Sequence, residues 1–214
     1  MTNGPLVYVV DDDMVILEKL DALLTSKGYS VRTFARPDEF LSLAKPHVPA
    51  CLILDLHPED CNGLAVQRQL TGDEAMPVIF LSEAVDVPTT VKAMRAGASE
   101  FLLKPFREEQ LLSSVRAALK QADEQWADRQ LVGRIRKYYL SLTPREREVL
   151  PYIVLGFLNK QTAYELGTSE ITIRIHRGKI MRKMNASSLA DLVWFASRLG
   201  IPDRTSTVRA LMRA

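Results

Sequence analysis

Acidic, hydroxyl and ammonium side chains follow the ends of several short apolar runs in this chain. Three aspartates, residues 11–13, come directly after LVYVV, and Asp55 ends CLILD. Ser82 follows PVIFL, and Lys104 follows EFLL. Carboxylates about 4 Å apart repel by about 4 kcal/mol at an effective dielectric near 20, so they need a compensating cation, a shared proton or water. A divalent cation and a lysine would supply the positive charge, and an aspartate between them could be a nucleophile towards a phosphoryl group.

The elements that must position these side chains are five predicted strands, each followed by a helix. The strands are expected at residues 6–10, 30–34, 51–55, 77–81 and 100–103, and the helices at 14–27, 37–44, 62–71, 87–96 and from 106 onward. This alternation predicts an α/β fold, a doubly wound five-stranded parallel sheet covered on both faces. Ligands of such sheets bind at the carboxyl ends of the strands, where Asp11, Asp12 and Asp55 are predicted to converge. Asp13 is expected to face solvent or to begin the helix.

Charge is distributed unevenly along the 214 residues. Residues 1–122 carry 12 Lys and Arg against 17 Asp and Glu, whereas residues 141–214 carry 12 against 6. An acidic half joined to a basic half predicts two domains, of which only the second meets a polyanion. Cys51 and Cys61 lack metal-ligand spacing and are expected to be reduced thiols. No signal-like segment or apolar run of 18 residues is present, so a cytoplasmic protein without membrane contact is expected.

The segment that joins the two halves has the pattern of one long amphipathic helix. Apolar side chains recur at spacings of three and four from Leu112 to Trp126, and such a helix could pair with a second copy. Gly133 interrupts the pattern as a hinge or as a tolerated residue, because glycine in a helix interior costs about 1 kcal/mol relative to alanine.

The basic half is predicted to be a small all-α domain of four helices. In LTPREREVL, Thr143 is placed as the N-cap, Pro144 at the first helical position and Glu146 three residues after the cap, which completes a capping box. NKQTAYEL, the turn GTS and EITIRIHRGKIMRKM then form a helix-turn-helix candidate, followed by SLADLVWFASRL. The third of these helices alternates apolar residues with Arg174, Arg177, Lys179, Arg182 and Lys183, a pattern typical of DNA binding.

Both halves resemble known families. VVDDD, LILDL, IFLS and EFLLKPF resemble, in order and spacing, the flavodoxin-like receiver domain of two-component response regulators. LTPREREVL and NKQTAYELGTSEITIRIHRGKIMRKM resemble the LuxR-type DNA-binding domain. The pairing is similar to the NarL/FixJ group, and DVPTTVKAMRAGASEFLLKPF resembles its FixJ-like branch. The expected organisation is a receiver domain at 1–122, a helical linker at 123–140, a helix-turn-helix domain at 141–200 and a C-terminal tail at 201–214.

The receiver resemblance implies a role for each residue of the acidic site. Asp55 would accept a phosphoryl group from a sensor histidine kinase. Mg²⁺ or Mn²⁺ would be bound by Asp12 and Asp55 directly, by Asp11 through water and by the backbone carbonyl of His57. The residues that respond to or support the phosphoryl group would be Ser82, Phe101, Lys104 and Pro105, the last after a cis peptide bond.

Two positions depart from the receiver pattern. The family usually has a proline four residues after the phosphorylated aspartate, whereas this chain has Pro58 one place early and Glu59 in its place. The residue after the switch hydroxyl is usually small, and here it is Glu83. A carboxylate there is expected to slow phosphorylation by charge and bulk, and it could equally slow attack by water.

The LuxR-type resemblance implies a division of labour on DNA. Lys160, Thr172 and Lys179 would contact phosphates, while Arg174, Ile175 and Gly178 would face base edges in the major groove. Because Gly178 replaces a longer polar side chain, readout at that place would pass to Arg177 or to water. His176 would contact the DNA backbone or pack internally, and Arg182 belongs to the same cationic face.

The function expected from both resemblances is transcription regulation switched by phosphorylation. Phosphorylated Asp55 would favour a homodimer that binds double-stranded DNA and acts on RNA polymerase. Such a protein is no enzyme beyond catalysing its own phosphorylation and dephosphorylation. Two alternatives stay open: an atypical receiver controlled by a partner without phosphorylation, and, more remotely, an aspartate-nucleophile phosphatase. The phosphatase would want a second acid two residues after the nucleophile, where this chain has His57.

Overall fold

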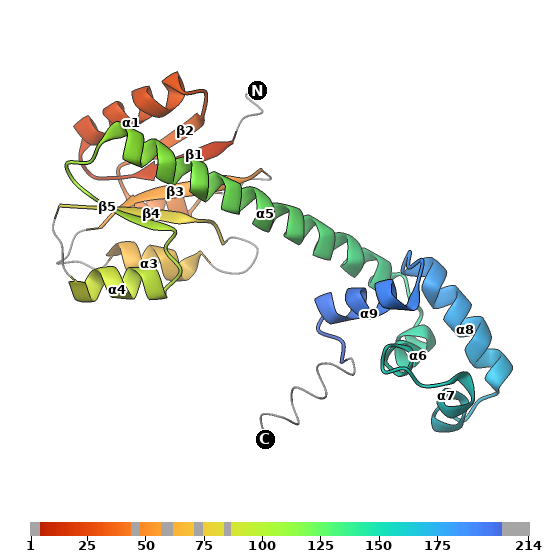
Figure 1. Ribbon diagram of the computed structural model, residues 1–214. Helices are drawn as coiled ribbons and strands as arrows, with labels where there is room; N and C mark the ends of the chain where they lie inside the picture. The colour runs from red at the N-terminus through yellow and green to blue at the C-terminus, as the bar shows by residue number, and fades with distance from the viewer. Residues whose placement is uncertain (1–4, 44–47, 57–61, 71–74, 84–86, 203–214) are drawn as a thin grey trace. The chain divides into compact units, whose positions relative to one another are not determined.

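The computed structural model describes residues 5–43, 48–56, 62–70, 75–83 and 87–202 (Figure 1). The chain divides into two compact units, Met1–Ala127 and Asp128–Ala214. Most of the predicted C-terminal tail, residues 203–214, lies outside the described residues.

The first unit is built on a five-stranded sheet in which all neighbouring strands are parallel. The strands are β1 (Leu6–Val10), β2 (Ser30–Phe34), β3 (Ala50–Asp55), β4 (Val78–Ser82) and β5 (Glu100–Leu103). Their order is β2-β1-β3-β4-β5, with β1 and β3 in the middle. Val10 pairs with Leu54 and Asp55 with Leu81, so the strands that carry the acidic residues end level with one another. The predicted parallel sheet is confirmed.

Helices cover both faces of this sheet. They are α1 (Met14–Ser26), α2 (Pro37–Leu41), α3 (Asn62–Gln69), α4 (Val87–Arg95) and the first part of α5 (Glu108–Leu140). Figure 1 shows α1 and α5 on one face and α3 and α4 on the other. The helix expected at 37–44 already ends at Leu41, where Ser42 follows as its C-cap.

Side-chain alternation along the strands produces two separate cores. Val7 and Val9 point to one face and pack with apolar residues of α1 and α5. Tyr8 and Val10 point to the other face and pack with residues of α2 and α3, including Phe40. Because strands buried on both faces need apolar residues at every position, β3 reads ACLIL before its terminal aspartate. Burial raises the pKa of the Cys51 thiol in this strand to about 12, so the thiol stays protonated.

The second unit consists of the end of α5 and four further helices. These are α6 (Pro144–Val154), α7 (Asn159–Glu165), α8 (Glu170–Lys183) and α9 (Leu189–Arg198). Ile135 of α5 is buried in the same core as residues of α6, α8 and α9. Thr143 caps α6 with the predicted capping box, and Pro144 is its first residue. α5 continues helically through Gly133.

The turn between α7 and α8 is fixed by backbone conformation and by a side chain from α6. Gly167 has φ of +60°, a value that glycine adopts without steric penalty. Arg145 Nη2 donates a 2.8 Å hydrogen bond to the Leu166 carbonyl at the end of α7, and Ser169 caps the start of α8. The helix-turn-helix arrangement predicted from the glycine turn is confirmed.

A buried acid of α6 pairs with a cation of α8. Glu146 is 2% exposed, and its Oε2 lies 2.7 Å from Lys183 Nζ. The same oxygen accepts a hydrogen bond from the Thr143 backbone amide at 2.8 Å. Burial opposes the charged form, but the hydrogen bonds from Lys183 and Thr143 outweigh it, so the pKa of Glu146 lies below its usual range. The pair fixes α8 against α6.

The second unit is therefore expected to lose stability at acidic pH through this pair. A carboxyl whose pKa is lowered by folding stabilises the folded state above its unfolded pKa, and this contribution disappears as the pH falls below about 4.5. Lys183→Met should shift the midpoint of acid unfolding to higher pH. Trp194 fluorescence in a Trp126→Phe background would follow this unit, because the chain has only these two tryptophans.

Arg182→Met is the matched control for this prediction, because it removes an exposed cation from the neighbouring position of α8. We expect its acid midpoint to stay at the wild-type value. Equal shifts for Arg182→Met and Lys183→Met would show that net charge, rather than the Glu146 pair, sets the acid stability.

Among the described residues, none of the helices combines the length and the apolar character that a bilayer-spanning segment requires.

Candidate functional site

Three carboxylates of the first unit meet at the carboxyl edge of the sheet. Asp11 directly follows β1, Asp12 is the next residue, and Asp55 is the last residue of the neighbouring strand β3. Asp11 is buried, Asp55 is half-buried and Asp12 is exposed. The predicted convergence of the three acids is confirmed. Asp13 is instead the N-cap of α1, and its side chain accepts a 2.8 Å hydrogen bond from the Val15 amide.

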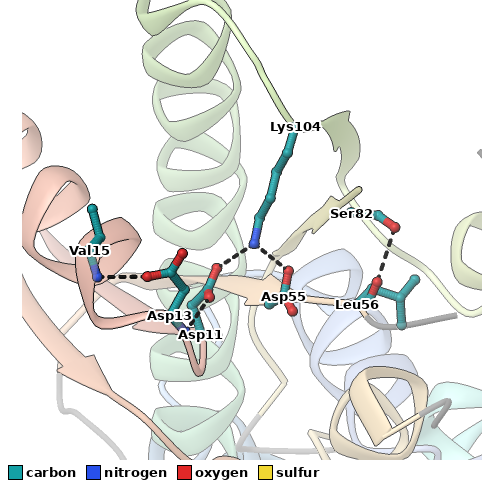
Figure 2. Close-up of polar contacts among 7 residues, drawn as sticks. All are labelled: Asp11, Asp13, Val15, Asp55, Leu56, Ser82 and Lys104. Carbon is teal, nitrogen blue, oxygen red and sulfur yellow. Dashed lines mark hydrogen bonds and ion pairs between the residues drawn. The ribbon is translucent and has the colours of Figure 1, made fainter. Parts of the chain in front are cut away.

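Lys104 bridges two of these carboxylates. Its Nζ lies 2.8 Å from Asp11 Oδ2 and 2.7 Å from Asp55 Oδ1. Figure 2 shows the lysine side chain extending from the end of β5 to a point between the two acids. The Lys104 side chain is only 11% exposed, so this charge pairing is weakly screened by solvent. The compensating cation demanded by the acidic cluster is thus present within the chain itself.

The protonation states of this group follow from burial and pairing. Burial raises the pKa of Asp11 above its ordinary value, and it outweighs the hydrogen bond from Lys104 that favours the charged form. For Lys104 burial acts in the opposite direction, but hydrogen bonds with Asp11 and Asp55 outweigh it and raise the pKa. Lys104 therefore remains an ammonium group at neutral pH.

The carboxylates fit a small divalent cation. One oxygen from each of Asp11, Asp12 and Asp55 lies within 4.8 Å of the others. Mg²⁺ holds oxygen ligands at about 2.1 Å, so opposite ligands of an octahedral shell are about 4.2 Å apart. A hard oxygen-ligand set of nearly this size suits Mg²⁺.

A hydroxyl lies on the strand next to Asp55. Ser82 ends β4, and its Oγ donates a 3.0 Å hydrogen bond to the Leu56 carbonyl, directly after Asp55 (Figure 2). The Lys104 amide donates to the Ser82 carbonyl at 2.8 Å, which links the ends of β4 and β5. Phe101 of β5 is half-buried and packs against the core on the α3 side of the sheet. Ser82 and Lys104 are therefore linked through the ends of β4 and β5, while Phe101 lies earlier on β5 and pairs with Phe80.

Other predicted positions lie around this centre or outside the described residues. The Lys104–Pro105 peptide bond is cis, as the resemblance implied. Glu83 is exposed and directly follows Ser82. His57, Pro58 and Glu59 lie outside the described residues, so the expected carbonyl ligand and the altered loop carry no structural description.

The predicted DNA-contacting residues lie on the helix-turn-helix of the second unit. Lys160 is exposed at the start of α7, and Thr172 lies in the first turn of α8 with its Oγ1 2.8 Å from Ser169 Oγ. On α8, five further predicted residues are exposed: Arg174, Ile175, Gly178, Lys179 and Arg182. His176 and Arg177 are half-buried instead.

The structure adds positioning residues that the sequence interpretation missed. The sequence pattern groups Lys183 with the cations of α8, but its ammonium group pairs with buried Glu146. Arg145, which was not singled out, caps the end of α7 and also pairs with Glu148 at 2.7 Å. The capping box located Glu146, but no local signal shows that the same carboxylate also binds a lysine 37 residues later.

Two families of known proteins match this chain. Residues 7–116 match the family described as response regulator receiver domain, and residues 140–196 match bacterial regulatory proteins of the luxR family. The response regulator protein TodT of Pseudomonas putida is 46% identical over 198 residues, which are 92% of this chain and 87% of TodT. The transcriptional regulatory protein FixJ of Azorhizobium caulinodans is 36% identical over 196 residues, covering 91% of this chain and 93% of FixJ.

A solved structure is similar to this chain over most of its length. The response regulator StyR is similar with a TM-score of 0.75 and 41% sequence identity, over 91% of this chain and 99% of the StyR chain. In this chain the receiver match precedes the luxR-family match, and the chain covers 87% of TodT. The chain therefore belongs to the NarL/FixJ group of two-component response regulators, with a receiver domain and a LuxR-type DNA-binding domain.

Proposed function

We propose that phosphorylation of Asp55 by a sensor histidine kinase switches this protein to a dimer that binds specific DNA and regulates transcription through RNA polymerase. The observation that carries the proposal is the bridge from Lys104 to Asp11 and Asp55 at the carboxyl edge of the sheet. The receiver would occupy residues 1–122, the linker 123–140 and the DNA-binding domain 141–200.

The chemistry follows from the positions of the charged groups. An Asp55 carboxylate oxygen attacks the phosphorus of a phosphohistidine, an oxygen–phosphorus bond forms, and the phosphorus–nitrogen bond breaks with its electrons returning to the imidazole. Asp12, Asp55 and the His57 carbonyl would hold Mg²⁺ directly and Asp11 through water, and the ion would neutralise charge on the transferring group. Lys104 already contacts Asp55 Oδ1 and needs only a small movement to pair with a phosphoryl oxygen.

Phosphorylation would change the structure outside the site through residues of β4 and β5. The Ser82 hydroxyl would exchange the Leu56 carbonyl for a phosphoryl oxygen, because a charged acceptor makes the stronger hydrogen bond. Phe101, on the neighbouring strand β5, would move into the space this leaves, and Pro105 would hold Lys104 in place. The altered surface of α4 and β5 would then favour the dimer.

DNA binding measured with and without phosphorylation tests this proposal. The full chain would be incubated with Mg²⁺ and acetyl phosphate, and its size and its binding to DNA selected from genomic fragments would be compared with untreated protein. We expect a larger species and tighter binding for wild type only, with Asp55→Asn unchanged by the treatment. Equal responses of wild type and Asp55→Asn would contradict a switch at Asp55.

Glu83 favours a second candidate, a receiver that a partner protein controls without phosphate. Its exposed carboxylate next to Ser82 repels an incoming phosphoryl dianion. At an effective dielectric near 20, like charges about 8–17 Å apart repel by about 1–2 kcal/mol, so Glu83→Ala should speed labelling by a small phosphodonor about tenfold. The rate of mass gain under excess donor measures this effect.

Glu83→Gln separates charge from bulk in the same experiment. It keeps the size of the side chain, so an increase similar to that of Glu83→Ala identifies charge as the cause. Unchanged labelling rates in both variants would remove Glu83 as a control of phosphorylation.

A further inference from the structure

On the exposed side of α8, apolar and cationic residues occupy separate positions around the helix. After Glu170 in the first turn, its exposed residues recur at helical spacing, and they are Ile171, Arg174, Ile175, Gly178, Lys179 and Arg182. At 3.6 residues per turn, Ile171, Ile175, Gly178 and Arg182 lie along the midline of this face. Arg174 lies to one side of the midline and Lys179 to the other. The first two turns of the midline therefore carry no polar side chain.

The two isoleucines of this midline are strongly exposed. Ile171 is 68% exposed and Ile175 is 53% exposed, although Ile173 and Ile180 of the same helix are buried. Within the described part of the chain, Ile173 and Ile180 are covered by neighbouring residues, whereas Ile171 and Ile175 are largely left uncovered. Four residues of helix separate their Cα atoms by about 6 Å along the axis, which is close to two base-pair steps of about 3.4 Å.

Gly178 continues the same midline with a residue that disfavours helices. Glycine is among the least favourable residues in a helix interior. Nothing in the described chain requires it, because a Cβ at this position would meet no neighbouring atom within 4 Å. The absence of a side chain at this position therefore has no cause in the packing of the described chain. It would allow a second molecule to approach the helix closely at Gly178.

We propose that Ile171, Ile175 and Gly178 form an apolar strip that recognises the 5-methyl groups of thymines in the major groove. The inference rests on the proposed DNA-binding function and deepens it by naming the chemical group that is read. The thymine methyl is the apolar group that base pairs present in that groove. Lys179, on one side of the strip, would complement the phosphates that border the groove, and Arg174, on the other side, would reach a base edge. Gly178 leaves room for a methyl group beside Ile175.

Replacing thymine by deoxyuracil removes only the methyl group and so tests the strip directly. A site would first be selected from random duplexes by the full chain, with and without acetyl phosphate treatment. Each thymine of that site would then be replaced singly by deoxyuracil. For wild type we expect binding to weaken about fourfold at one or two positions, the loss corresponding to about one buried methyl group.

Variants of the strip assign the methyl contacts to side chains. If Ile171 or Ile175 contacts a given thymine methyl, its alanine variant should bind the thymine duplex and the duplex with deoxyuracil at that position equally well. Gly178→Ala should bind the thymine duplex more weakly than wild type and recover when the nearby methyl is removed. Leu140→Ala, which truncates a 61% exposed side chain on α5, is the matched control and should keep the wild-type pattern.

Each contrary result has a distinct meaning. A selected site that wild type binds equally with thymine and deoxyuracil throughout would overturn the apolar strip while leaving DNA binding intact. Methyl effects of the same size in wild type and in both isoleucine variants would also overturn it, because the contact would then lie elsewhere. Failure to select any sequence would overturn the DNA-binding function itself and the strip with it.

Discussion

Lys104→Met is expected to lower the free energy of unfolding of the receiver by about 3–5 kcal/mol when divalent cations are chelated. The substitution leaves Asp11 and Asp55 facing each other without the ammonium group that lies within 2.8 Å of each. Asp11 is 1% exposed, so water screens the repulsion poorly. Hydrogen exchange of amides in β1 and β3 would measure the loss, because these central strands report on opening of this unit alone.

Mg²⁺ and acid should each rescue the Lys104→Met variant. A cation bound by the acidic cluster replaces the missing positive charge, so stability should rise with Mg²⁺ concentration. Without the ammonium group, the pKa of Asp11 should rise beyond its already raised wild-type value. A carboxyl whose pKa is raised by folding binds more protons in the folded state, so stability should increase as the pH falls from 7 towards about 5.

Lys120→Met is the control, because it removes an exposed lysine of α5. We expect its exchange protection and its Mg²⁺ dependence to equal those of wild type. Unchanged protection in Lys104→Met, or a loss that Mg²⁺ and acid both fail to restore, would show that the bridge does not balance the carboxylates.

Arg174→Ala and Lys160→Ala are expected to weaken DNA binding in different ways. Loss of a base-edge contact by Arg174 would reduce discrimination between target and random duplexes about tenfold or more, since a good bidentate contact is worth about 1–3 kcal/mol. Loss of a phosphate contact by Lys160 would weaken both duplexes alike and reduce the salt slope of binding by about one. Titrations of both duplexes at several salt concentrations separate these effects.

Arg116→Ala provides the control for net charge, because it removes an exposed arginine from α5 within the receiver. Its effects on target and random DNA should be small. If Arg174→Ala and Lys160→Ala lost the same factor on both duplexes, the assignment of base contacts to α8 and phosphate contacts to α7 would be wrong.

Much of the receiver could be predicted because its local and global signals coincide. Apolar runs of strand length mark β1, β3 and β4, and a parallel sheet brings their carboxyl ends to one edge. The convergence of Asp11, Asp12 and Asp55 therefore followed from strand ends alone. The early end of α2 could not be predicted, because helix boundaries depend on packing and capping that short apolar patterns do not record.

The periodicity of the sequence could not predict which residues of other helices the long side chains would contact. The spacing of cations on α8 identifies a charged helix, but it does not distinguish Arg174, which is exposed, from Lys183, which pairs with Glu146 across two helices. The same limit applies to Arg177, which is half-buried although the sequence suggested it for base readout. Only the packing of α6 against α8 shows which cations remain available for DNA.

Intact mass after phosphodonor treatment tests the central claim most directly. Wild type and Asp55→Ala would be incubated with Mg²⁺ and a small acyl phosphate, and hydrogen exchange would confirm that both are folded. A gain of one phosphoryl group by wild type and none by Asp55→Ala is the result that a switch at Asp55 predicts. No gain by folded wild type, or an equal gain by both proteins, would contradict it.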